Sequence, residues 1–418
     1  MKIFRIVQIG DIHFTDPENF ELSVDNKDTG FPSALSEAIG TSPLQAVFRQ
    51  VAHILERREI HLVSFMGDFT TRGDEAALQD CLRYLRRLFP VPWNLGEPPL
   101  CQVLIGNHDL DRRLDPNSDD RFERINGIFT AEGFPAASVS APQEIALCAD
   151  GEPQLRLFGL NSCKGCGQLR LLGGIIQRTA GPAIQAIISD PSAPKDLLDE
   201  IYENIDTPAV DDAAITQLVE TLNELPEDSL PVICAHHNLL PQETPRLAPY
   251  TELVNAGSIR AALISCDRPL LYLHGHLHTD PVEVVRVPGR QRSAIVSIAA
   301  PIFRSGFNLL EIAFSESVPL GCRITPYRLQ GSHVIKEATL TVPLWSAEEG
   351  LRLATRNGRT VMGTLRPDTI HYRADLLREM DFEGVALDDA LVELQWLGVI
   401  QIADMNRPSS QWRITRSI

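Results

Sequence analysis

Five short motifs of the chain contain side chains that readily hold metal ions. They follow one another as Asp11-x-His13, Gly67-Asp68, Gly106-Asn107-His108-Asp109, His236-His237 and Gly275-His276-Leu277-His278. Carboxylate and amide oxygens mixed with imidazoles suit Mn, Fe, Zn or Ni better than calcium or a thiolate-preferring metal. The alternative is a set of unrelated polar residues on the surface or in the core.

The number of candidate ligands favours two metals over one, because two ions can share a bridging carboxylate. Clustered metal-binding residues mark a site, and we expect seven ligands: Asp11, His13, Asp68, Asn107, His236, His276 and His278. Two metals about 3.5–4 Å apart lower the pKa of a bridging water and clamp phosphate oxygens, so that a hydroxide attacks phosphorus in line. The motifs therefore predict hydrolysis of a phosphoester.

Further side chains beside these ligands have predicted roles. His108 is placed to stabilise developing charge or to protonate the leaving oxygen. Asp109 is expected to orient His108, and its alternative role is a helix cap. Arg72 suits a contact with substrate phosphate, or is a surface arginine. His237 and His274 would point to the opposite side of an extended backbone, so we expect both in the core or behind the ligands.

The motifs each follow a segment that predicts a buried strand: 3–9, 61–66, 101–105, 231–235 and 270–273. Apolar residues at helical spacing over 44–55 and 78–88 predict helices between the first three strands. A long surface loop is expected over 14–42. Alternating strands and helices indicate a layered α/β domain, whose functional loops lie at the carboxyl ends of the strands.

The later part of the domain predicts strands at 155–160, 284–287, 294–298 and 308–312, a helix around 215–222, and an end near residue 330. The stretch 163–209 is expected to be an insertion near the site. It contains Cys163-Lys164-Gly165-Cys166, which we interpret as plain thiols in a turn, with a redox or regulatory pair as the alternative. A structural zinc usually takes four ligands, and the chain has no second Cys-x-x-Cys.

The composition is that of an ordinary globular protein, with 418 residues, 44% apolar and 22% charged. The start of the chain lacks the apolar region of a signal peptide, so we expect a cytoplasmic protein without membrane contact. Eight cysteines without a repeated spacing fit reduced thiols. The net charge of −17 disfavours non-specific binding to nucleic acid.

The last part of the chain differs, because residues 352–418 contain nine Arg and nine Asp or Glu and carry no net charge. Leucines at helical spacing from Leu387 to Leu397 predict a helix that ends at Gly398, and two short strands are expected around Pro408. This order predicts a small α+β module of winged-helix type over 345–418. Such a module could bind a protein partner or nucleic acid.

The motif series over residues 1–330 resembles that of the calcineurin-like metallophosphoesterase superfamily. The resemblance implies a four-layer α/β/β/α sandwich with two divalent metals, of which manganese is favoured. It assigns the first metal to Asp11, His13, Asp68 and His278, with Asp68 as the bridge. It completes the ligand set of the second metal with Asn107, His236 and His276.

Two segments look like the small-molecule and cyclic-nucleotide phosphodiesterase branch of this superfamily: Gly67-Asp68-Phe69-Thr70-x-x-Gly73 and Asn161-Ser162. Asn238 stands where that branch often has proline, and Arg72-Gly73 faintly resembles the protein phosphatases. The first hypothesis is a phosphodiesterase of a nucleotide or similar small diester. The alternatives are a DNA or RNA nuclease that acts with a partner subunit, and a non-catalytic scaffold.

Overall fold

The computed structural model describes most of the chain. The described residues are 1–14, 44–89, 99–111, 113–149, 152–168, 174–188, 190, 192–194, 197–198, 200–201, 206–241, 252–290, 292–380, 382–405 and 407–417. The loop expected over 14–42 therefore lies outside the described residues, except for Phe14. No helix among the described residues is both long and apolar enough to cross a membrane.

The first large sheet has seven strands in the order β12-β11-β10-β1-β2-β3, with β13 beside β11. Its strands are β1 (Lys2–Ile9), β2 (Leu62–Phe65), β3 (Leu100–Val103), β10 (Gly306–Ser315), β11 (Val318–Gln330), β12 (His333–Lys336) and β13 (Leu340–Pro343). β1, β2 and β3 are parallel, whereas β10 runs antiparallel to β1. The sheet thus extends to Pro343, beyond the domain end expected near residue 330.

The second large sheet has six strands in the order β4-β5-β6-β7-β9-β8. Its strands are β4 (Gln143–Ala149), β5 (Glu152–Gly159), β6 (Leu230–Cys234), β7 (Pro269–His274), β8 (Val282–Arg286) and β9 (Ala294–Ala299). The strands from β5 to β9 in this order pair in parallel. β6, β7 and β9 are buried along their whole length, as expected for strands covered on both faces.

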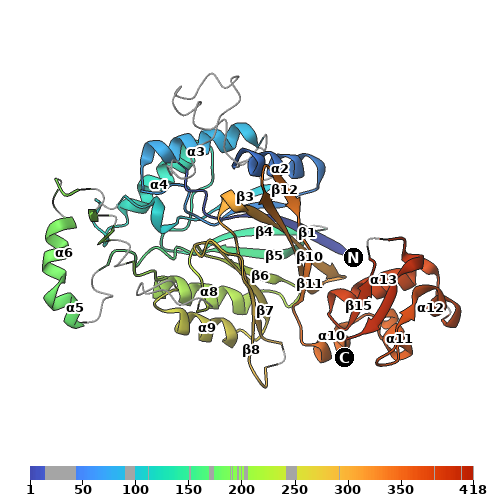
Figure 1. The fold of residues 1–418 in the computed structure, drawn as a ribbon. Helices are drawn as coiled ribbons and strands as arrows, with labels where there is room; N and C mark the ends of the chain where they lie inside the picture. Colours follow the sequence, from blue (N-terminus) through green and yellow to red (C-terminus); the bar gives the residue numbers. More distant parts are fainter. Residues whose placement is uncertain are drawn as a thin grey trace.

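Helices cover the outer face of each sheet (Figure 1). The first sheet is covered by α2 (Leu44–Arg57), α3 (Glu75–Leu88) and α4 (Asp120–Ala131), and its strands share one buried core with these helices. The second sheet is covered by α8 (Asp212–Glu224) and α9 (Ala256–Ser265). A further core fills the space between the two sheets. The predicted four-layer α/β/β/α sandwich is therefore confirmed.

The expected insertion contains α5 (Gly174–Thr179) and α6 (Gly181–Ile188), which stand apart from the sandwich in Figure 1. The last part of the chain forms α10 (Ala347–Leu353), α11 (Arg356–Thr364), α12 (Arg373–Glu379) and α13 (Gly384–Trp396), with strands β14 (His371–Tyr372), β15 (Ile400–Ala403) and β16 (Arg413–Arg416). The strands form a separate sheet in the order β14-β16-β15. This arrangement contains the helix and the strand pair that were expected for the module; its assignment as a winged helix stays a prediction.

Candidate metal centre

The carboxyl ends of five strands meet at one edge of the sandwich. Asp11 follows β1, Asp68 follows β2 and Asn107 follows β3 in the first sheet, where Asn107 begins the short 3-10 helix η2 (Asn107–Asp109). His236 follows β6, and the His276–His278 turn follows β7 in the second sheet. The two sheets therefore contribute to one site, as the sequence predicted.

The backbone at this edge is strained. A positive φ outside glycine occurs at five of the seven predicted ligands: Asp11 (23°), His13 (46°), Asp68 (54°), His276 (67°) and His278 (60°). Residues in such sparsely populated regions cost about 1–3 kcal/mol each and cluster at functional sites. The surrounding structure holds these five ligands in conformations that a relaxed loop would avoid.

Four of the predicted ligands form the first cluster. One ligand atom from each of Asp11, His13, Asp68 and His278 lies within 4.8 Å of the others. The Nε2 atoms of His13 and His278 are 3.1 Å apart, and His278 Nε2 is 3.9 Å from Asp11 Oδ1. Three of the four residues are buried, whereas the His278 side chain is 41% exposed, so this cluster opens to solvent on the His278 side.

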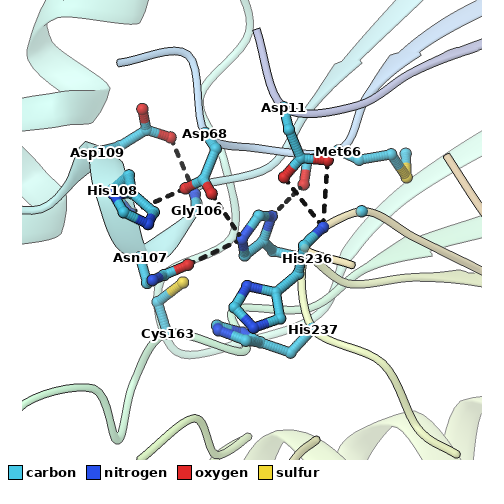
Figure 2. Close-up of polar contacts among 12 residues, drawn as sticks. Asp11, Met66, Asp68, Gly106, Asn107, His108, Asp109, Cys163, His236 and His237 are labelled. Atoms are coloured by element: carbon cyan, nitrogen blue, oxygen red, sulfur yellow. Dashed lines mark hydrogen bonds and ion pairs between the residues drawn. The ribbon is translucent and has the colours of Figure 1, made fainter. Parts of the chain in front are cut away.

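The remaining predicted ligands adjoin the first cluster through Asp68. His236 Nε2 lies 3.2 Å from Asp68 Oδ2 and 3.0 Å from Asn107 Oδ1, and Figure 2 shows these contacts. The rings of His236 and His276 are 5.2 Å apart between their centroids. The structure thus brings all seven predicted ligands together around one carboxylate.

The two oxygens of the Asp68 carboxylate have different surroundings. Oδ1 accepts a hydrogen bond from the His108 backbone N–H at 2.8 Å. Oδ2 is buried without a hydrogen-bond partner among the described residues, although His236 Nε2 and His13 Nε2 lie 3.2 and 3.8 Å from it. A buried carboxylate oxygen without a donor is costly. A divalent cation at this oxygen would satisfy it, so the residues present fit a divalent-metal site.

Backbone groups aim the ligands at this centre. The Met66 carbonyl faces Nδ1 of His236 at 2.7 Å, which leaves Nε2 of that ring toward Asp68. The backbone N–H of His276 donates to both carboxylate oxygens of Asp11, at 3.0 and 3.2 Å. Gly106 approaches Asp68 so closely that a Cβ there would lie 2.0 Å from Oδ1. Met66 and Gly106 act through the main chain, a role that their residue types alone do not reveal.

Two of the predicted ligand imidazoles have a protonation state that fits metal binding. Burial lowers the pKa of His13 to about 3 and that of His276 well below its usual value, which keeps both imidazoles in the neutral form that binds metals. Burial raises the pKa of Asp11 to about 7. Burial opposes ionisation of His236 and Asp68 too, but their mutual attraction outweighs it, so the pKa of His236 rises and that of Asp68 falls.

The predicted role of Asp109 needs correction. Its carboxylate accepts hydrogen bonds from the backbone N–H groups of Gly106 and Thr70, both at 2.9 Å, and thus caps η2 and joins two loops. The ring of His108 is held instead by the Thr71 carbonyl, 2.9 Å from Nδ1. Asp109 therefore has the capping role that was its alternative, because its side chain turns into the core.

His108 and Arg72 remain beside the centre. The ring centroids of His108 and His13 are 5.1 Å apart, so His108 borders the first cluster at His13. Arg72 is exposed and directly follows Thr71, whose carbonyl holds the His108 ring. A contact between Arg72 and a substrate stays a prediction.

The two histidines predicted to lie behind the ligands are both buried. His274 Nδ1 lies 3.1 Å from the Gly275 carbonyl, and burial lowers its pKa to about 4. His237 Nδ1 lies 2.9 Å from Ser162 Oγ, and Ser162 also accepts hydrogen bonds from the backbone N–H groups of His236 and His237. The sequence showed Ser162 only as part of a branch resemblance, and gave no signal for this positioning role.

Comparison with known proteins agrees with the geometry. A family model described as calcineurin-like phosphoesterase matches residues 4–280, more than half of the chain. The chain belongs to this family. Members of the family are generally metal-dependent hydrolases of phosphoesters, and the buried Asp and His cluster of this chain is its candidate for the divalent metal. No curated protein matches the sequence.

Solved structures with a similar fold are distant in sequence. NAD nucleotidase of Haemophilus influenzae is 12% identical, with 94% of this chain and 60% of that chain covered and a TM-score of 0.42. The calcineurin-like phosphoesterase YfkN of Bacillus subtilis is 10% identical, with coverages of 95% and 99% and a TM-score of 0.36. GAP50, described as the anchor in the inner membrane complex of Plasmodium, is 9% identical, with coverages of 83% and 90% and a TM-score of 0.44.

Proposed function

We propose that this chain is a binuclear-metal phosphodiesterase that hydrolyses a phosphodiester of a nucleotide or similar small molecule. The observation that supports the proposal is the clustering of the seven predicted ligands around Asp68, whose buried Oδ2 has no hydrogen bond among the described residues. Asp11, His13, Asp68 and His278 would hold one metal. Asp68, Asn107, His236 and His276 would hold the other.

The metals, when bound, would supply an activated water and neutralise charge on the phosphate. The chain itself supplies the proton donor. His108 Nδ1 donates its hydrogen bond to the Thr71 carbonyl, 2.9 Å away, which fixes one proton on that nitrogen. Nε2 is then the atom of His108 that can pass a proton to the leaving oxygen, a role that suits histidine near neutral pH.

Access and charge favour a small substrate. The His278 side chain is partly exposed, and His108 is half-buried. The exposed Arg72 could bind a phosphate oxygen with its fork of donors. The net charge of −17 repels a long polyanion. The second hypothesis is a nuclease that acts with a partner subunit. An assay on both small diesters and DNA distinguishes the two hypotheses.

The test is an assay of the purified chain with Mn²⁺ on a panel of phosphoesters. The panel contains bis-p-nitrophenyl phosphate, p-nitrophenyl phosphate, cyclic nucleotides, and single- and double-stranded DNA. The proposal expects Mn²⁺-dependent turnover that is fastest on the small diesters. Preference for DNA would favour the nuclease, and preference for the monoester would contradict the diesterase assignment.

A pair of histidine variants links the activity to the site. His276→Gln removes a predicted ligand, and we expect a loss of more than about 100-fold in kcat/KM, since even residues that only support metal ligands cost 10–100-fold when changed. His53→Gln changes an exposed histidine on α2 and should leave the activity as it is. Equal activity of His276→Gln and the unchanged chain would contradict the proposal.

A further inference from the structure

A second group of metal-ligating side chains lies behind the binuclear centre. Ligand atoms of Cys163, Cys166 and His237 all lie within 4.8 Å of one another, and all three residues are buried. The His237 ring packs against His276 with centroids 4.5 Å apart. Figure 2 shows Cys163 and His237 on the side of His236 away from Asp11. None of the three belongs to the seven predicted ligands of the binuclear centre.

A carboxylate lies beside this group. Asp206 is a neighbour of both Cys166 and His237, and its Oδ2 lies 3.9 Å from His237 Nε2. His237 Nδ1 is engaged with Ser162 Oγ. Nε2 is buried and lacks a hydrogen-bond partner among the described residues. A buried ring nitrogen without a hydrogen-bond partner among the described residues thus belongs to the same residue as the ring beside the two thiols, and a carboxylate lies next to it.

The chain builds this space from two segments. The Cys163–Cys166 segment forms a turn, in which the Cys166 N–H donates to the Cys163 carbonyl at 3.0 Å. The buried Arg121 guanidinium donates to the carbonyls of Cys163, Lys164 and Cys166. The segment of Asp206 runs alongside, because Thr207 Oγ1 donates to the Gly165 carbonyl at 2.7 Å and Ala209 N–H to that of Ser162 at 3.0 Å.

We propose that Cys163, Cys166, His237 and Asp206 bind a structural zinc ion, distinct from the two metals of the catalytic centre. Zn²⁺ takes four ligands in closed tetrahedral sites, with bonds of about 2.0–2.3 Å to imidazole, carboxylate and thiolate. These bonds place ligand atoms roughly 3.3–3.8 Å apart, and the His237 Nε2 and Asp206 Oδ2 atoms are 3.9 Å apart. Thiolates also select zinc over the harder metals that suit the oxygen-rich centre.

The proposed ion would tie three parts of the molecule together. It would join the turn after β5, the Asp206 segment and His237, which directly follows the ligand His236. Two thiolates and one carboxylate bring three negative charges against two on the ion. The guanidinium of Arg121 lies on the outer side of the turn and offsets the remainder. A single Cys-x-x-Cys therefore suffices here, because the other two ligands come from distant segments.

The first test compares bound zinc among three forms of the full chain, measured by elemental analysis after dialysis. The double variant Cys163→Ser/Cys166→Ser is expected to lose about one zinc per chain. Cys148→Ser removes an exposed thiol outside the group and should lose none. Asp68→Asn should keep this zinc even where the metals of the catalytic centre are lost. Unchanged zinc in the double variant would overturn the proposal.

A second test needs no variant, and so it decides the matter even if the double variant fails to fold. Cobalt replaces zinc in the unchanged chain, and a thiolate-to-cobalt charge-transfer band is expected in the near-ultraviolet spectrum. The seven ligands of the catalytic centre contain no sulfur and cannot produce that band. Its absence would overturn the proposal. So would a Cys163–Cys166 disulfide, detected as a mass lower by two hydrogens.

Discussion

His108 differs from the metal ligands around it in exposure and in contacts. It is half-buried, its ring lies beside His13, and its Nδ1 is fixed by a backbone carbonyl. These contacts suit a side chain that handles a proton and holds no metal. At the scale of single residues, we therefore expect metal binding and proton transfer to fall on different side chains.

His108→Gln is therefore expected to lower kcat by about 10²–10⁴-fold, the usual contribution of a general acid. The content of bound metal should not change. Because p-nitrophenolate leaves readily without a proton, the loss should be smaller for bis-p-nitrophenyl phosphate than for a cyclic nucleotide. Steady-state kinetics on both substrates measure this difference. An equal loss on the two, or a loss of metal, would contradict proton transfer by His108.

The clustering of the seven predicted ligands could be foreseen from the sequence because metal chemistry restricts their residue types and because each follows a recognisable strand. The groups that aim them could not. Met66 acts through its carbonyl and Gly106 through its missing side chain. Asp109 looked catalytic in Asn107-His108-Asp109, and only the fold reveals that its carboxylate faces two backbone N–H groups.

The loops after β2 and β3 are the elements that position Asp68. Gly106, at the end of the β3 loop, leaves room for the Asp68 carboxylate, since a Cβ there would lie 2.0 Å from Oδ1 and 2.3 Å from the Asp68 nitrogen. The Asp68 carboxylate and the Asp68 backbone could not move away from such a Cβ without disturbing the site. We therefore expect metal binding to depend on the close contact between these two loops.

Gly106→Ala is expected to abolish binding of at least one metal and to reduce kcat/KM by more than about 10-fold, since support of a ligand is lost. Gly127→Ala is the matched control. Gly127 lies in α4, and an added Cβ there meets nothing within 4 Å. The control should retain its metal and gain slight stability, as alanine favours helix. Metal content and thermal unfolding of both variants check the expectation, and full metal content in Gly106→Ala would refute it.

A histidine with a lowered pKa, His61, connects β2 to β1. His61 Nδ1 accepts the Arg5 backbone N–H at 3.2 Å; the neighbouring charged groups are the Arg5 side chain and Glu59, 4.0 Å from Nε2. Burial lowers the pKa of His61 below 6.5, so the unfolded chain binds this proton more readily than the folded one. The contribution of neutral His61 is complete above about pH 6.5 and declines as pH falls below it.

The variant His61→Gln should therefore lose less stability than the unchanged chain between pH 6.5 and pH 5. Chemical denaturation at several pH values measures the two slopes. His53→Gln, which changes an exposed histidine, should keep the slope of the unchanged chain. Identical slopes for all three proteins would rule out this role of His61.

The strands that the sequence did not predict lie mostly at sheet edges. β12 is exposed except for one partly buried residue, and β13 has a single fully buried residue. Such strands lack the apolar pattern that identifies β1, β6 and β7. They join the sheet because β11 offers pairing partners, which is a property of the tertiary structure.

At the scale of the whole molecule, the C-terminal module shares a core with the sandwich. The core between the two sheets continues into residues of α11, α13 and β15. Trp396 is fully buried, and the Arg323 guanidinium of β11 lies 4.2 Å from its ring centroid. The module and the sandwich should therefore unfold together.

Trp345, Trp396 and Trp412 are all in the C-terminal part, whereas Trp93 is elsewhere. In a Trp93→Phe background, tryptophan fluorescence should thus report unfolding of the module, whereas circular dichroism reports unfolding of the whole chain. We expect the two unfolding transitions in denaturant to have the same midpoint. Trp396→Ala should cost about 3–5 kcal/mol and shift both transitions equally. Two separate transitions would show that the shared core does not couple the parts.

Electron paramagnetic resonance of the Mn²⁺-titrated chain tests whether two metals share the Asp68 carboxylate. We expect binding of two Mn²⁺ per chain with the spectrum of an exchange-coupled pair. We also expect loss of that coupling in Asp68→Asn. A spectrum of isolated Mn²⁺ at every stoichiometry, or the same coupled spectrum in Asp68→Asn, would contradict a shared carboxylate.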